Sequence, residues 1–144
     1  MPTDSCDVRL HHELPEPPAV VWQFLVTPDG AARWLGRPDR RLDIAGPVTL
    51  VMIDDGRPVE VKLNIDFVDP PHELDLRWQW PGEPWSRVRL DLRASKTGTI
   101  LTLRHTGVPT ALQEEYRLGW EAHLDRLLGG VRAGAASYQN GNSQ

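Results

Sequence analysis

The chain has 144 residues, a formal net charge of −4 and a single cysteine, Cys6. A chain of about 150 residues buries about 70% of its unfolded surface, so this length predicts one domain with a real core and room for an interior pocket. The single cysteine excludes an internal disulfide and a multi-cysteine metal site, and it favours a reducing compartment.

The first element that we expect is a strand over residues 6–14, because side chains alternate there between two characters. Val8 and Leu10 share one face, whereas Arg9 and His11 share the other. This pattern is typical of a strand with one buried face and one solvated face.

Two short helices should follow this strand. Prolines over 15–18 end the strand, and Pro18 suits the first position of a helix that runs through Leu25. Thr27 is the expected N-cap of a second helical turn or two that ends near Gly36. Together these two segments predict a helical elbow.

Residues 41–107 alternate with a period close to two, and turns rich in Gly, Pro and Asp interrupt the pattern. About six more strands are therefore expected. The alternation is strictest at Val59, Val61, Leu63, Ile65 and Phe67, at Leu74, Leu76, Trp78 and Trp80, and at Val88, Leu90 and Leu92. One antiparallel sheet with a single apolar face accounts for this part of the chain.

The last expected element is a long amphipathic helix. Thr110 and Gln113 have the spacing of a capping box, so the helix should begin there. An apolar stripe about 100° wide on the helical wheel collects Tyr116, Trp120, His123, Leu124, Leu127 and Val131. We expect one domain over residues 1–136, with the helix ending at the glycine pair that begins at Gly129 or continuing to residue 136, and a flexible tail over 137–144.

These elements predict an α+β fold in which one long helix covers the apolar face of the sheet. If the sheet curls around the helix, the two surfaces need not fill the space between them, so a cavity can remain.

Four parts of the sequence resemble one known family. They are LPEPPAVVWQFL at 14–25 with ARWLG at 32–36, VDPPHEL at 68–74, GTILTLRHTG at 98–107, and YRLGW at 116–120. In this order they resemble the activator-of-heat-shock-protein-90-ATPase-like proteins, within the START-related, birch-pollen-allergen-like superfamily also called SRPBCC. The resemblance spans residues 6–132.

The resemblance implies the helix-grip fold, a curved seven-stranded antiparallel sheet around a long C-terminal helix, with two short helices after the first strand. It does not imply one activity, because members include lipid and hormone carriers, polyketide cyclases and a co-chaperone. Fold alone therefore does not assign the function.

Inward-facing aromatic residues are the best candidates for binding a ligand. Indole rings could form a flat apolar wall for an aromatic or lipid-like molecule, or they could simply fill the core. The residues that we expect around the cavity are Met52, Leu63, Trp78, Trp80, Leu90, Leu103, His105, Tyr116, Trp120 and His123.

His105 and His123 have two interpretations. Each is either a core histidine whose ring nitrogens are hydrogen-bonded or a polar group that lines the pocket. In the first case the partner of His105 would be a backbone carbonyl or Tyr116. Gly119 also has two interpretations. A glycine within a helix costs about 1 kcal/mol of stability, and either close packing against a neighbour or space kept for a ligand would offset that cost. We favour packing.

Catalytic and metal-binding patterns are absent from the sequence. His11 and His12 point to opposite faces of a strand, so we expect no metal site and no cofactor. An enzyme would have to use His105, His123 or Tyr116 as its acid, base or donor. Scattered arginines argue against a nucleic-acid partner, and short apolar runs argue against a membrane span. The N-terminus carries no secretory signal, so we expect a cytoplasmic protein.

Three functions follow from these observations. The leading hypothesis is a small cytoplasmic protein that binds a hydrophobic molecule between sheet and helix. The alternatives are an enzyme of the cyclase or dehydratase type that uses the same pocket and a cofactor protein for a chaperone ATPase. Val51 and Ile53 add apolar side chains to the outer face of their strand, so a second copy of the chain is a further candidate partner.

Overall fold

The structure is a computed structural model that describes residues 5–142, with side chains described for residues 5–132. The chain forms seven strands and three α-helices in that part. In chain order they are β1 (Ser5–Leu14), α1 (Pro18–Val26), α2 (Pro28–Trp34), β2 (Arg37–Pro38), β3 (Gly46–Asp54), β4 (Arg57–Asp69), β5 (Glu73–Gln79), β6 (Ser86–Ser95), β7 (Gly98–Pro109), a short 3₁₀ turn η1 (Thr110–Leu112) and α3 (Gln113–Asn142).

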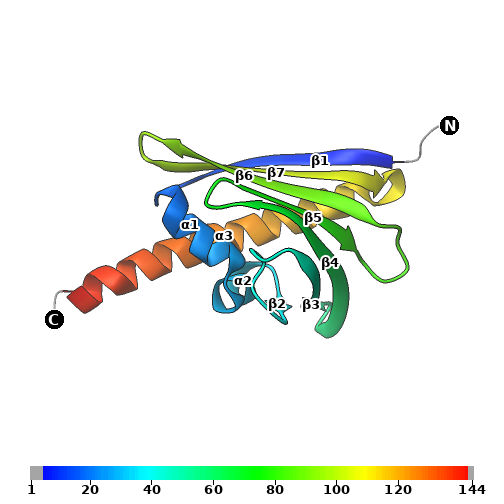
Figure 1. Cartoon of the computed structure of the whole chain (residues 1–144), viewed down its shortest axis with the longest axis horizontal. Helices are drawn as coiled ribbons and strands as arrows, with labels where there is room; N and C mark the ends of the chain where they lie inside the picture. The colour runs from blue at the N-terminus through cyan, green and yellow to red at the C-terminus, as the bar shows by residue number, and fades with distance from the viewer. Residues whose placement is uncertain (1–4, 143–144) are drawn as a thin grey trace.

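All strands belong to one antiparallel sheet in the order β1-β7-β6-β5-β4-β3-β2. In β5 and β6 the apolar side chains that were predicted to face inward are buried, while their neighbours lie closer to solvent. Figure 1 shows the strands curving around α3, whose C-terminal end extends beyond the sheet. This arrangement is the helix-grip fold, as the sequence resemblance implied.

The helical elbow between β1 and β2 forms as predicted. Pro18 opens α1, and the side-chain oxygen of Thr27 accepts a hydrogen bond of 3.0 Å from the backbone N–H of Gly30 at the start of α2. A Cβ at Gly30 would lie 2.6 Å from the carbonyl oxygen of Phe24, so the close approach of the two helices requires glycine. The elbow packs against α3 and thereby holds α2 at one side of the sheet's concave face.

The start of α3 differs from the predicted capping box. The side chain of Gln113 donates a 3.1 Å hydrogen bond to the backbone carbonyl of Asp7, and no side chain caps η1 at Pro109. The Gln113 side chain therefore joins the start of α3 to the beginning of β1 instead of forming a capping box.

The end of α3 also differs from the prediction. The helix continues through Gly129 and Gly130, and its backbone reaches Asn142, so most of the expected tail over 137–144 is helical. Each glycine costs a helix about 1 kcal/mol, which is not enough to stop a helix held by its neighbours. Residues 143 and 144 lie outside the described residues.

Two surface features bear on possible partners. Ile53 is 70% exposed, whereas Val51 is half-buried beside β2. The chain itself therefore covers part of the apolar outer face of β3. Binding of a second copy of the chain to this face stays a prediction. Within residues 5–142, no helix has an apolar stretch long enough to cross a bilayer.

Candidate functional site

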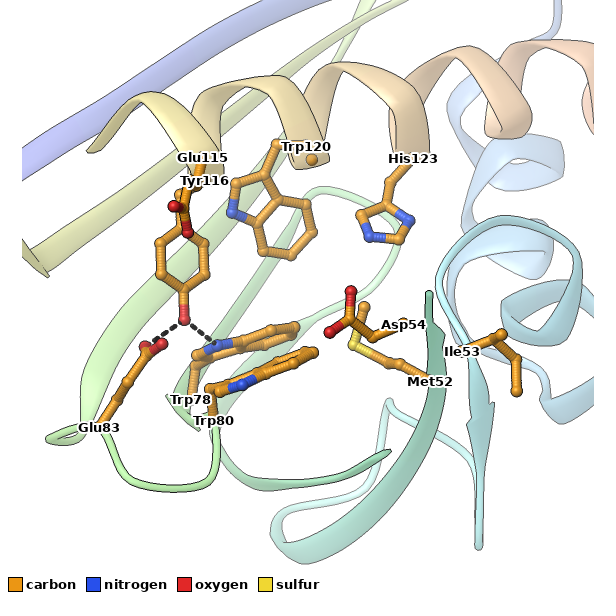
Figure 2. Close-up of a pocket in the computed structure, with 11 residues that line it drawn as sticks. Met52, Ile53, Asp54, Trp78, Trp80, Glu83, Glu115, Tyr116, Trp120 and His123 are labelled. Atoms are coloured by element: carbon orange, nitrogen blue, oxygen red, sulfur yellow. Dashed lines mark hydrogen bonds between the residues drawn. The ribbon is translucent and has the colours of Figure 1, made fainter. Parts of the chain in front are cut away.

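A cavity of about 290 Å³ opens between the end of the sheet and α3. Trp78 in β5 and Trp80 just after it lie on one side, and Trp120 and His123 of α3 lie on the other (Figure 2). The end of β3 closes a third side with Met52, Ile53 and Asp54. The strand alternation and the helical stripe therefore bring aromatic side chains from two layers to one hollow.

The aromatic rings pack edge to face around this cavity. The ring centroids of Trp78 and Trp120 are 5.2 Å apart at an interplanar angle of 56°, and those of Trp78 and Tyr116 are 6.5 Å apart at 76°. Tilted and T-shaped arrangements are favourable because the edge of one ring meets the electron-rich face of the other. The rings thus stabilise one another while still lining open space.

Tyr116 connects α3 to the loop between β5 and β6. Its hydroxyl donates a hydrogen bond of 2.5 Å to a carboxylate oxygen of Glu83 and accepts one of 3.1 Å from the indole N–H of Trp78 (Figure 2). Burial, together with the bond to Glu83, raises the pKa of the Tyr116 hydroxyl far above its ordinary value. Tyr116 therefore stays protonated at physiological pH and holds one end of the cavity in place.

His105 does not line the cavity, which corrects our expectation that it would. Its side chain is fully buried on β7, and its Nδ1 accepts a 3.0 Å hydrogen bond from the indole N–H of Trp120. Its Nε2 lies 2.6 Å from the hydroxyl oxygen of Ser86, which is also within 3.4 Å of the carbonyl oxygen of Trp78. His105 is a satisfied core histidine, but its partners are Ser86 and Trp120 rather than a backbone carbonyl or Tyr116.

The hydrogen bonds fix the proton positions of this buried network. Because Nδ1 of His105 accepts from Trp120, the ring proton sits on Nε2 and is donated to Ser86, whose hydroxyl then donates to the carbonyl of Trp78. Burial lowers the pKa of His105 to about 4, so the ring is neutral at pH 7. A neutral ring shielded from the cavity has no access to a substrate, so His105 is not suited to be a catalytic acid or base.

His123 does line the cavity. Its Nδ1 lies 2.9 Å from the carbonyl oxygen of Trp34 in α2, which fixes the orientation of the ring. Burial lowers the pKa of His123 to about 4, although the contact with the Trp34 carbonyl acts in the opposite direction. This imidazole is therefore an uncharged polar group at the cavity wall.

Three predicted leucines lie elsewhere in the core. Leu63, Leu90 and Leu103 are buried on the inner face of the sheet, but they are not among the residues around the cavity. Their alternation gave the correct face of each strand. The alternation does not indicate which positions along that face are covered by α3 and which face the cavity.

Gly119 is the clearest departure from the sequence interpretation. We expected close packing at this helical glycine, but an added Cβ would meet no atom of the described residues within 4 Å. Gly119 instead lines the cavity beside Trp120. The missing side chain therefore leaves open space, which was the other interpretation of its cost.

The sequence interpretation missed the acidic residues of the cavity. Asp54 ends β3, Glu83 lies in the loop after β5, and Glu115 lies in the first turn of α3. Turns and element ends have no periodicity, so alternation could not assign these residues to a face. Their grouping depends on the curvature of the sheet.

A second cavity of about 540 Å³ adjoins the first and shares Ile53 and His123 with it. Three arginines line it, and they come from α2, β2 and α3: Arg33, Arg37 and Arg126. In the part of the chain that the structure describes, no group of three or more His, Cys, Asp or Glu side chains has the geometry to hold a metal ion.

Several solved structures share this architecture. CalU16 from Micromonospora echinospora is 27% identical, with a TM-score of 0.71 over 96% of this chain and 84% of its own. The SPO3351 protein from Silicibacter pomeroyi is 20% identical, with a TM-score of 0.81 over 89% of this chain and 99% of its own. These structures support the helix-grip fold.

DynU16, described as a protein in the dynemicin biosynthetic locus, is 24% identical to this chain. The match has a TM-score of 0.80 and covers 92% of this chain but 49% of DynU16, so this chain spans about half the length of that protein. No curated protein matches this chain. Residues 15–129 match the family described as Activator of Hsp90 ATPase homolog 1-like protein, and this match runs from the residue after β1 into α3. The chain therefore belongs to the Activator of Hsp90 ATPase homolog 1-like family.

Proposed function

We propose that this protein binds a compact, flat and largely apolar small molecule in the cavity between the sheet and α3. Trp78, Trp80 and Trp120 provide the apolar surface, and the Tyr116 hydroxyl provides a fixed polar point. The observation that carries the proposal is the cavity of about 290 Å³ that these rings line, into which the helix presents Gly119, a residue with no side chain.

The dimensions of the cavity suit a small guest. Its volume of about 290 Å³ lies just below the range for ligand pockets, which is about 300 to 1,000 Å³, so only a small guest fits. A ligand held there would contact indole faces and edges on both sides. The description of DynU16 as a protein in a biosynthetic locus agrees with a small-molecule ligand for this fold.

The test is a pair of matched glycine variants. Gly119→Leu places a side chain in the cavity, whereas Gly129→Leu places the same side chain on an exposed part of the same helix. Tryptophan quenching and calorimetry with naphthylmethanol should show saturable binding to the parent protein and to Gly129→Leu. We expect Gly119→Leu to weaken this binding at least tenfold. Absence of saturable binding to the parent, or equal binding to both variants, would refute the proposal.

The enzymatic alternative remains a proposal with fewer candidate groups. His105 is buried away from the cavity, so Tyr116 and His123 are the candidates that remain from the sequence. A survey of cyclase and dehydratase substrates, with Tyr116→Phe as the comparison, would test it.

The proposed partners and location need separate measurements. Co-elution with the host chaperone and an ATPase assay would test the chaperone alternative. Light scattering at micromolar concentration would test for a second copy, and cell fractionation would test the cytoplasmic location.

A further inference from the structure

Acidic side chains from three parts of the chain line the aromatic cavity. Asp54 comes from the end of β3, Glu83 from the loop after β5, and Glu115 from α3. Among the residues that the structure describes around this cavity, none is a lysine or an arginine. The one imidazole, His123, has its pKa lowered to about 4 by burial and is uncharged at neutral pH. The charged side chains that line the cavity are therefore all acidic, and the nearest cation at the His123 wall is Arg126, whose Nη2 lies 2.5 Å from Nδ1 of His123.

The indole rings also attract positive charge. Trp78, Trp80 and Trp120 line the cavity, and the face of an indole attracts cations through the ring quadrupole. Figure 2 shows the carboxylate of Asp54 directed toward the ring ends of Trp78 and Trp80. A cation placed between these groups would meet aromatic surface and carboxylate oxygens at the same time.

We propose that the cavity selects an organic cation, a ring-bearing molecule with an ammonium or quaternary ammonium group, over neutral and anionic molecules of the same shape. This proposal rests on the proposed function and assigns the chemical class of its ligand. A neutral guest would gain no attraction from these carboxylates, and an anionic guest would be repelled by them.

The neighbouring cavity is lined by side chains of the opposite charge. Arg33, Arg37 and Arg126 line that second cavity, and His123 and Ile53 lie between it and the acidic cavity. A positive group is therefore repelled by the arginines of the second cavity and attracted by the carboxylates of the first. The two adjoining cavities differ in the sign of their charged side chains.

Three probes with one ring system test the charge preference in the parent protein. They are naphthylmethyl-trimethylammonium, naphthylmethanol and naphthylacetate, and calorimetry at constant ionic strength gives their dissociation constants. The cation should bind about tenfold more tightly than the neutral probe, and naphthylacetate should bind most weakly. Equal affinity for the cation and the neutral probe, with both weakened by Gly119→Leu, would overturn the charge preference and leave the proposed function standing. Failure of all three probes to bind would overturn both.

A matched pair of double variants tests the carboxylates. Asp54→Asn/Glu115→Gln removes two charges from the cavity, whereas Asp55→Asn/Asp125→Asn removes two from neighbouring exposed positions outside it. The first variant should lose the preference for the cation, measured as the ratio of the dissociation constants of naphthylmethanol and the cation. The second should keep the preference. Retention of the tenfold preference in the first variant, or equal loss in both, would overturn the proposal.

Discussion

The indole N–H of Trp120 reaches from α3 to Nδ1 of His105 on β7 across 3.0 Å. This bond joins the roof of the cavity to the buried centre of the sheet, because Nε2 of His105 in turn contacts Ser86 on β6. The orientation of the Trp120 ring is therefore set by the core and not by a ligand. A cavity wall held in this way is preorganised.

Replacing His105 should destabilise the fold. In His105→Ala, the indole N–H of Trp120 and the hydroxyl of Ser86 lose a buried partner, and a void replaces the ring. We expect the free energy of unfolding to fall by about 2 to 4 kcal/mol. Urea denaturation followed by circular dichroism measures it, and a loss under about 1 kcal/mol would contradict the network.

Ser86→Ala provides the partner substitution. The double variant with His105→Ala should lose less stability than the sum of the two single variants, with a coupling of about 1 kcal/mol. Strict additivity would mean that the 2.6 Å contact between Ser86 and His105 contributes nothing.

Stability should fall as the pH falls from 6.5 toward 4. The pKa of His105 is about 4 in the folded protein and 6.5 without the influence of the fold, because burial disfavours the charged ring. The unfolded chain therefore binds a proton first, so the contribution of His105 to stability is complete above pH 6.5 and is lost by about pH 4. At most about 3 kcal/mol depends on this group.

The pH effect is isolated by comparison with His105→Gln. Carboxylates titrate in both proteins, so the difference between their unfolding free energies is the informative quantity. This difference should shrink as the pH falls from 7 to 4.5. A constant difference over that interval would show that the His105 ring does not resist protonation.

Tyr116→Phe should destabilise the protein by removing the hydrogen bonds that join α3 to β5 and the loop after it. The substitution removes the donor to Glu83 and leaves the indole N–H of Trp78 without its acceptor. We expect a loss of about 1 to 2 kcal/mol in urea denaturation. Glu83→Gln keeps an acceptor for Tyr116 and should lose less; a larger loss from Glu83→Gln would contradict this assignment.

Gly119→Ala should stabilise the protein by about 1 kcal/mol, because alanine favours the helix and its methyl group enters open space. The melting temperature should rise by about 3 °C for a domain of this size. Gly129→Ala is the control, since that position is also open but lies outside the cavity. A lower melting temperature for Gly119→Ala alone would show that the space beside Trp120 is filled.

Gly98→Ala should be strongly destabilising. Gly98 begins β7 with φ of 154°, and a Cβ there would lie 2.0 Å from the carbonyl oxygen of Leu14 at the end of β1. The two strands would have to separate, at a cost of about 3 kcal/mol. Gly82→Ala is the comparison, because Gly82 has φ of 82° without any described atom within 4 Å, and it should cost about 1 kcal/mol. Equal losses would refute the steric explanation.

The sheet could be predicted from the sequence because its pattern has a strict physical cause. A register error of one residue would turn Leu74, Leu76 and Trp78 from the core to solvent, so the alternation specifies their face. The helical stripe placed Tyr116 and Trp120 against that face for the same reason. The layers of the fold follow from these two periods.

The boundary of the cavity could not be predicted in the same way. Leu90 and Trp78 share an inner face, but only the curvature of the sheet determines which of them meets open space. His105 was expected to face inward, and it does; its partner Ser86 lies 19 residues earlier, where no local pattern indicates it. Gly119 indicated a special position, because glycine destabilises a helix. That destabilisation was compatible both with close packing at Gly119 and with open space beside it.

The pairing of β1 with β7 has a consequence for synthesis. Leu10 lies opposite Leu103, and Ser5 lies opposite Pro109, so the strand that a ribosome makes first is neighbour to the strand made last. At about 5 to 20 residues per second, the N-terminal segment waits several seconds without its hydrogen-bonding partner. Closure of the sheet is therefore a late event during translation, and the nascent chain exposes the edge of β1 until β7 has emerged from the exit tunnel.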